Sequence, residues 1–191
     1  RCDDYQGGYI AGKHLLELGH RHFLYLPGPK YNLSQTRRYA GIMDALSEAN
    51  VPASNIREID YHTVFGSSAE STSSYKPYEE LFFPVNYTAV IGFNDLQSYS
   101  AMEILQKKGY RIPEDISLIS FDHLRKTHTY LPPLTSIADN SEKSIADTAV
   151  SILLDKIRNP SSEISSEVLP VSIFDDHTTG PINETFAHSF E

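Results

Sequence analysis

The chain has 191 residues, 40% of them hydrophobic, and a formal net charge of −9 at pH 7. This length and apolar content are enough for one domain with a substantial core. The acidic balance argues against a DNA-binding surface on this stretch, which would need a clustered basic face. No run of about 18 apolar residues predicts a membrane span, and the single cysteine excludes an internal disulfide framework and fits a reducing cytoplasm.

The first part of the chain alternates between the apolar spacing of helices and that of strands. One helical pattern ends at Gly19, the usual type of residue just after a helix. A buried strand then stops at Pro27-Gly28, a strong turn signal. The elements predicted here are a helix at 7–20, a strand at 22–28, a helix at 34–50 and a strand at 56–61.

The alternation continues after a loop rich in Ser and Thr at 66–74. Alternating strands and helices indicate a parallel β-sheet covered by helices on both faces, so the predicted fold class is α/β. The elements predicted here are a short helix within 75–83, a strand at 88–93, a helix at 95–108, a strand at 116–122, a helix at 141–158 and a strand at 167–174.

Polar side chains follow several of the predicted strands. In an open parallel sheet, ligands bind beyond the carboxyl ends of the strands, where the loops are free to vary. Arg38 and Ser34 follow the first strand, Asn94 and Asp95 follow the third, and Asp122 follows the fourth. A guanidinium, an amide and carboxylates that converge on one crevice suit a ligand with many hydroxyl groups.

Each of these residues also has an ordinary structural explanation. Asp95 is more typical of a helix N-cap than of a ligand contact, and an arginine on a helix, such as Arg38, is usually solvated. Catalytic motifs are scarce, because G-x-S-x-G, G-x-x-x-x-G-K-[ST] and a strand-borne G-x-G-x-x-G do not occur. The eight histidines lack metal-ligand spacing, so we predict neither a metal site nor a cofactor.

Taken together, the motifs resemble the lactose/galactose repressor (LacI/GalR) family of bacterial transcription regulators over nearly the whole chain. Their order and spacing make the resemblance specific, although each short piece alone would be weak. The matching stretches are DYQGGYIAGKHLLELGHRHFLYLPGP, RRYAGIMDAL with its R-x-x-G pattern, AVIGFNDLQSYSAMEILQKKGYRIPEDISLISFDHLRKTHTYLPPLTSI, and the closing HTTGP.

The resemblance implies a periplasmic-binding-protein-like fold, in which two α/β subdomains are joined by three crossovers and a small effector binds between them. Residues 5–134 with 168–180 would form the C-terminal subdomain. Residues 135–166 would be the strand and helix returned to the N-terminal subdomain, and 181–191 would be a tail. Most of the N-terminal subdomain and the helix-turn-helix head would lie outside this chain.

The resemblance also implies roles for individual residues. It makes Asp95 the helix cap. The sequence departs from the family pattern at two places: Asp122-His123 replaces a common Asp-Asp pair, and Asp175-Asp176 stand near the usual place of an arginine. The implied effector contacts are Arg38, Asn94 and Asp122, with Ser34 and Asp139 at positions that some members use and His62 near an aromatic contact in a poorly aligned stretch.

The helix predicted at 95–108 has two apolar stripes, whereas a helix packed only on its own sheet needs one. Because the family dimerises largely through this helix, the resemblance implies a two-fold homodimer. The alternative is a helix buried on both sides within one chain. The implied interface residues are Leu96, Tyr99, Met102 and Tyr130.

The function implied is that of a sugar-sensing domain of a cytoplasmic repressor, without catalysis and with DNA contacted only through the missing head. An exported sugar-binding protein of a transport system is the alternative, and an α/β enzyme acting on sugars is a third reading. We expect Arg38, Asn94 and Asp122 to open onto one concavity. Replacing any of them with Ala should weaken the effector response roughly ten- to hundred-fold and barely change folding.

Overall fold

The computed structural model describes residues 1–59, 78–141, 144–161, 163 and 166–188. Its centre is a six-stranded sheet in the order β2-β1-β3-β4-β5-β6, parallel except for the antiparallel pair β5-β6. The predicted α/β class with a mainly parallel sheet is confirmed. The strands are β1 (Phe23–Leu26), β2 (Ile56–Glu58), β3 (Ala89–Gly92), β4 (Ser117–Phe121), β5 (Ser136–Asp139) and β6 (Val171–Phe174).

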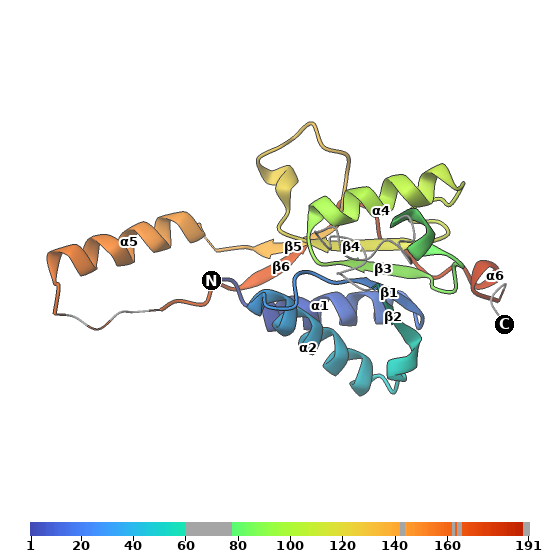
Figure 1. The fold of residues 1–191 in the computed structure, drawn as a ribbon, viewed down its shortest axis with the longest axis horizontal. Coiled ribbons are helices and arrows are strands. Elements are labelled where there is room, and N and C mark those ends of the chain that lie inside the picture. Colours follow the sequence, from blue (N-terminus) through green and yellow to red (C-terminus); the bar gives the residue numbers. More distant parts are fainter. Residues whose placement is uncertain (60–77, 142–143, 162, 164–165, 189–191) are drawn as a thin grey trace, which may run out of the picture.

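Helices cover both faces of this sheet, with α1 and α2 on one face and α4 on the other (Figure 1). The predicted loop at 66–74 lies outside the described residues, and a 3-10 helix occupies the described part of the helix expected within 75–83. The α-helices are α1 (Asp4–Glu17), α2 (Leu33–Glu48), α4 (Asp95–Lys107), α5 (Ile145–Arg158) and α6 (Glu184–Ala187). The 3-10 helices are η1 (Ala53–Asn55), η2 (Tyr78–Phe82) and η3 (Leu124–Lys126).

The core is divided between the two faces because successive strand residues point to opposite sides of the sheet. In β1, Phe23 and Tyr25 pack with α1 and α2, whereas Leu24 and Leu26 pack with α4. All four side chains are 2% exposed or less. This double burial explains why the strands are continuous apolar runs rather than alternating ones.

Two glycines let α1 and α2 approach each other closely. A Cβ atom on Gly41 would lie 2.1 Å from the carbonyl oxygen of Tyr5, and one on Gly8 would lie 1.9 Å from that of Arg38. Neither distance is sterically possible, so a larger residue at either position would force the helices apart. This contact gives the R-x-x-G motif a physical explanation, because Gly41 brings Arg38 on α2 against the first turn of α1.

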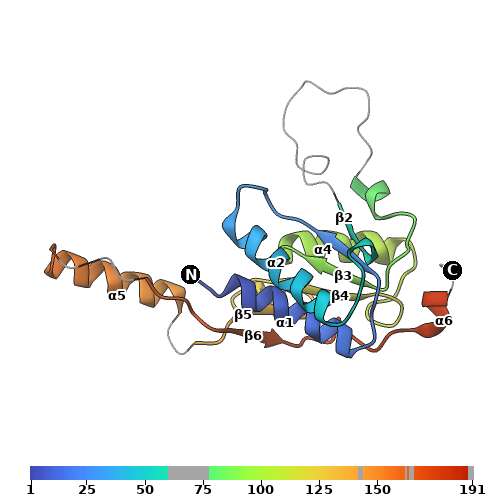
Figure 2. The ribbon, with the colours of Figure 1, turned by 90° about the horizontal axis from the view of Figure 1, so that it is seen from below.

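Helix α5 projects away from the sheet, beyond the end of β5 (Figures 1 and 2). Ser144 begins it with a reciprocal capping box with Asp147. Residues 135–166 were expected to return together to another subdomain, but residues 136–139 pair within this sheet. The apolar side chains of α5 are largely exposed: Ile145 44%, Val150 55%, Leu153 59%, Leu154 44% and Ile157 64%.

The stripe of α4 formed by Ala101, Ile104 and Leu105 packs within the chain together with Met102, which corrects one part of the predicted dimer interface. Met102 is 7% exposed and lies in the core with Phe82 and Leu134. Tyr99 is half-buried and donates a hydrogen bond to the carbonyl oxygen of Pro132 at 3.0 Å. Two of the other predicted residues remain on the surface: Leu96 is 66% exposed and Tyr130 is 80% exposed.

Within the described part of the chain, no helix combines the length and the apolar character that a membrane crossing requires.

Candidate functional site

The parallel strands β1, β3, β4 and β5 all end at the same side of the sheet, which we call the carboxyl edge. α5 follows β5 from this edge (Figure 2). A cavity of about 160 Å³ opens here. It is lined by Cys2, Asp3, Asp4, Gly7, Arg38, Phe121, Asp122, Ile137, Ala138, Asp139, Ile145 and Val171.

Arg38 is the central cation of this cavity. Its Nε lies 3.0 Å from Asp4 Oδ1, and its Nη2 lies 3.3 Å from Asp122 Oδ1. Its Nη1 donates to the carbonyl oxygen of Phe93 at 2.6 Å. The guanidinium carbon also lies 4.5 Å from the ring centre of Phe121 and 5.1 Å from that of Phe93. The side chain is 11% exposed and held from several directions, so its donors have a fixed orientation.

Asp4 holds Arg38 from the side of α1, and it was not among the residues predicted from the sequence. Asp4 is 7% exposed, and its second carboxylate oxygen accepts a hydrogen bond from Ser34 Oγ at 2.9 Å. Ser34 was predicted to contact the effector, and in the structure it stabilises the Asp4–Arg38 ion pair by donating a hydrogen bond to Asp4. A pairing signal did exist, because the glycine pattern of α1 and the R-x-x-G pattern of α2 together imply a close helix contact at this point.

Asp122 presents the most open carboxylate beside Arg38, with its side chain 45% exposed. Its backbone has φ of 97°, and the next residue, His123, has φ of 50°. A positive φ is uncommon for L-residues, although Asp and His tolerate it better than most. Each such residue costs about 1–3 kcal/mol, which contacts with its surroundings must offset. The strand therefore ends in a strained turn that carries the Asp122 carboxylate out to the carboxyl edge.

The helix cap expected at Asp95 is Asn94 instead. Asn94 is the N-cap of α4, and its Oδ1 accepts from the backbone N–H of Gln97 at 3.0 Å. Asp95 is 1% exposed and accepts from the backbone N–H of Leu124 at 2.7 Å and from Ser136 Oγ at 2.8 Å. Burial raises the pKa of the Asp95 carboxyl above its usual value, and these hydrogen bonds offset only part of that rise. Two adjacent residues that both favour caps leave the choice open in the sequence.

Asn94 does not line the same cavity as Arg38 and Asp122. It lies in a neighbouring hollow of about 340 Å³ along the carboxyl edge, and Phe93, which contacts Arg38, also lines that hollow. The expectation of a single concavity for all three residues is therefore wrong as stated. Asp139 does line the cavity with Arg38, and its Oδ1 accepts from Ser141 Oγ at 3.2 Å. His62 lies outside the described residues.

The chemistry of the cavity favours binding over catalysis. Burial raises the pKa of the Cys2 thiol, so this side chain stays protonated and is a poor nucleophile. No cluster of three or more His, Cys, Asp or Glu side chains suited to a metal ion occurs among the residues described. What the site offers is one fixed guanidinium with the carboxylates of Asp122 and Asp139, a set that accepts from and donates to hydroxyl groups.

Comparisons with known proteins identify the family of the chain. The chain matches the family described as periplasmic binding protein-like domain over residues 13–179. It is 35% identical over 170 residues to the HTH-type transcriptional repressor PurR of Escherichia coli, which covers 87% of this chain and 47% of that protein. The chain thus spans about half the length of the curated relatives it matches.

Solved structures share the fold closely. A LacI family transcriptional regulator from Enterococcus faecium, solved with bound ribose, superposes with a TM-score of 0.78 at 27% identity, covering 96% of this chain and 65% of the other. The dimeric Lac repressor with an 11-residue C-terminal deletion gives a TM-score of 0.75 at 26% identity, covering 95% and 64%.

The chain belongs to the periplasmic binding protein-like domain family. Within that family it is an effector-binding domain of the LacI/GalR type, as the relatives and structures above show.

Proposed function

We propose that this chain is the sensing domain of a transcriptional repressor and that it binds a small polyhydroxylated effector, such as a sugar, at the carboxyl edge. The observation that carries the proposal is the Arg38 guanidinium, which is held by Asp4 and stands beside the open carboxylate of Asp122. A carboxylate accepts hydrogen bonds from adjacent hydroxyls, and an arginine fork donates to their oxygens.

The relatives support this assignment. The Enterococcus faecium regulator, which shares the fold, contains bound ribose. The other proteins compared above are transcriptional repressors, which favours sensing over transport or catalysis on sugars. On this proposal the domain works in the cytoplasm, where the DNA of a bacterium is found, and it catalyses no reaction.

The proposal divides the effector contacts between two groups of residues. Arg38, Asp122 and Asp139 would bind the ligand from this cavity, while Asn94 and His62 would reach it from neighbouring positions. Helix α5, with its exposed apolar face, would pack in a second subdomain of a longer protein. The boundary between the two subdomains would then follow β5. An effector that bridges both subdomains would shift their closure and so change the spacing of DNA-binding parts elsewhere.

Isothermal titration calorimetry with a panel of pentoses and hexoses tests this proposal. We expect at least one sugar to bind, and we expect Asp122→Asn and Arg38→Lys to weaken its affinity roughly ten- to hundred-fold. The matched control is Glu103→Gln, an exposed site on α4 that leaves the cavity untouched. The proposal is overturned if no sugar binds, or if the cavity variants and the control bind equally well.

A further inference from the structure

The turn that carries Asp122 is held by three hydrogen bonds to two separate elements, β5 and α4. Asp122 N donates to the carbonyl oxygen of Ile137 at 2.9 Å, and His123 N donates to Ser136 Oγ at 2.9 Å. Leu124 N donates to Asp95 Oδ2 at 2.7 Å. Three successive backbone N–H groups are thus held, which is what keeps two consecutive residues at positive φ in one conformation.

Asp95 is the common anchor of two of these bonds. Its Oδ2 takes Leu124 N directly, and its Oδ1 accepts from Ser136 Oγ at 2.8 Å, the same hydroxyl that receives His123 N. The hydroxyl of Ser136 therefore donates to Asp95 and accepts from His123, so its orientation is determined. Both oxygens of the Asp95 carboxylate are used to hold the turn.

Helix capping does not explain this carboxylate. The N-cap is Asn94, which already accepts from Gln97 N. Asp95 is 1% exposed, and a buried carboxylate is retained only where donors stabilise its charge. The start of α4 adds the positive end of the helix dipole. The partners around Asp95 come from the turn after β4, from Ser120 on β4 and from Ser136 on β5, not from its own helix.

We infer that Asp95 is a positioning residue for the effector site. It places the Asp122 carboxylate beside Arg38 by holding the backbone of residues 123 and 124, and it does not touch the ligand. The expected effect of Asp95 on ligand binding rests on the proposed function. The effect of Asp95 on the turn can be measured without any ligand.

Asp95→Asn is the sharpest variant, because it keeps the volume and turns one acceptor into a donor that faces N–H or O–H groups. Leu105→Ala is the matched control on the same helix, since Leu105 is fully buried and lies away from the turn. It lowers stability through a cavity alone. Ser136→Ala removes the hydroxyl link to His123 and repeats the test in case Asp95→Asn does not fold.

Two measurements decide the inference. Amide hydrogen exchange measured by NMR reports on the turn. We expect Asp95→Asn to speed exchange of the Leu124 amide, and Ser136→Ala to speed that of the His123 amide. Each increase should be about ten-fold larger than the change that the same variant causes in the centre of β4. Calorimetry with D-ribose, or with the best-binding sugar of the panel, reports the site. We expect both variants to weaken affinity by about ten-fold, and Leu105→Ala to keep it within about two-fold even where it lowers the melting temperature as much.

The inference is overturned if Leu124 and His123 exchange as in the unmodified chain, or if Leu105→Ala weakens sugar affinity as much as Asp95→Asn does. If no sugar binds the unmodified chain, the proposed function fails, while the exchange data still decide whether Asp95 holds the turn. If the turn loosens and affinity is unchanged, Asp95 is a structural residue only.

Discussion

Arg38 is held by more of the chain than a ligand contact requires. It pairs with a buried carboxylate, bonds a backbone carbonyl and lies between two aromatic rings. These contacts argue against the sequence-based expectation that replacing Arg38 would barely change folding, which rested on crevice residues carrying little core packing. Asp122 differs from it, because its side chain is 45% exposed.

Arg38→Ala should lower the free energy of unfolding by about 3–5 kcal/mol, because it leaves the Asp4 carboxylate buried without its partner. Asp122→Ala should lower it by no more than about 1 kcal/mol, as is usual for an exposed partner. Urea unfolding followed by circular dichroism measures both. Equal midpoints for Arg38→Ala and the unmodified chain would show that Asp4 does not depend on Arg38.

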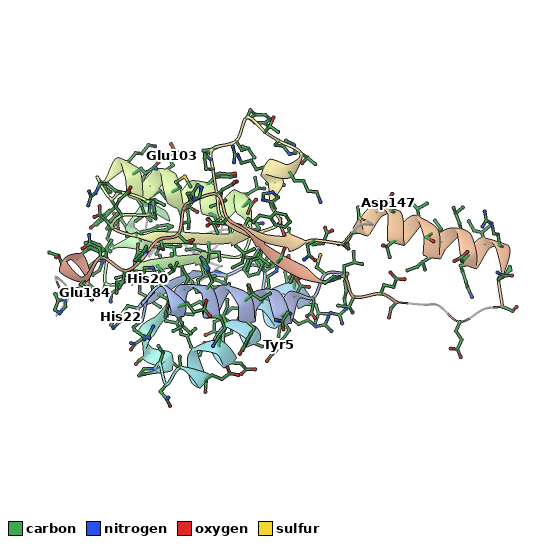
Figure 3. The ribbon with its side chains drawn as sticks, turned by 180° about the vertical axis from the view of Figure 1, so that it is seen from behind. Tyr5, His20, His22, Glu103, Asp147 and Glu184 are labelled. Atoms are coloured by element: carbon green, nitrogen blue, oxygen red, sulfur yellow. The ribbon has the colours of Figure 1, made fainter. Side chains whose placement is uncertain are left out.

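His20 is a second buried group whose chemistry has a measurable consequence. It lies at the end of the sheet away from α5 (Figure 3) and is 2% exposed. Its Nδ1 lies 2.9 Å from Thr88 Oγ1, and its Nε2 lies 2.9 Å from Ser117 Oγ and 3.0 Å from the carbonyl oxygen of Gly180. Burial lowers the pKa of His20 from 6.5 to about 4.

Between pH 6.5 and about 4, the unfolded chain therefore binds a proton at His20 that the folded chain does not. This contribution to stability is present above pH 6.5 and is lost as the pH falls, up to about 3 kcal/mol in total. In urea unfolding at pH 7 and pH 4.5, His20→Gln should lose less stability across the interval than the unmodified chain. Carboxylates elsewhere affect both proteins alike, so equal losses would contradict the assignment.

At this scale the sequence identified residue types better than their roles. Arg38 and Asp122 could be placed together because strand ends converge in a parallel sheet. Asp4 was missed because it follows no strand, and its only signal is the glycine-mediated contact between α1 and α2. The use of Asp95 to hold the turn, while Asn94 caps the helix, depends on where Leu124 and Ser136 lie, and no local pattern contains that information.

The packing of α1 on α2 is the element-scale feature on which the site depends. The contact places Tyr5 beside Asp44 and Tyr9 beside Glu48, with hydroxyl-to-carboxylate distances of 2.7 and 2.6 Å. Figure 3 shows Tyr5 on the side of the sheet that α1 and α2 cover. Arg38 lies on α2 and Asp4 on α1. A change in the separation of the two helices therefore changes the position of the Arg38 guanidinium in the site.

Gly41→Ala should therefore destabilise the chain by several kcal/mol, roughly the cost of overpacking or more, since its Cβ would lie 2.1 Å from the Tyr5 carbonyl oxygen. Ala40→Ser, at the exposed neighbouring position, should change stability by no more than about 0.5–1 kcal/mol. Thermal unfolding of the two variants distinguishes them. A Gly41→Ala protein as stable as Ala40→Ser would mean that the helices can separate without cost.

The elements themselves were largely predictable, because buried parallel strands are continuous apolar runs bounded by turn residues. The place of β5 was not. Its pairing with β4 and β6 is a long-range property, and the resemblance pointed to a strand returned elsewhere. Helix α5 could be recognised from its periodicity, but which surface it covers depends on residues beyond this sheet.

At the scale of the whole molecule, the surface of α4 and the loop after η3 is the proposed dimer contact. Leu96 and Tyr130 are its exposed apolar residues, at 66% and 80%. Met102 no longer belongs to it, because that side chain is already buried within the chain. Large apolar side chains exposed on a surface are candidates for an interaction site.

Analytical ultracentrifugation should show a dimer at roughly tens of micromolar, and Leu96→Glu should shift it toward monomer by placing a charge in an apolar contact. Glu103→Gln, on the same helix, should leave the dimer intact. A monomer at these concentrations for the unmodified chain would remove the proposed contact.

The central claim is that a polyhydroxylated effector binds between Arg38 and Asp122 at the carboxyl edge. A crystal structure of the protein with its best-binding sugar tests this most directly. We expect sugar hydroxyls within hydrogen-bond distance, about 2.6–3.2 Å, of the Asp122 carboxylate and the Arg38 guanidinium. A sugar bound elsewhere, with Arg38 and Asp122 still facing only each other, would contradict the account.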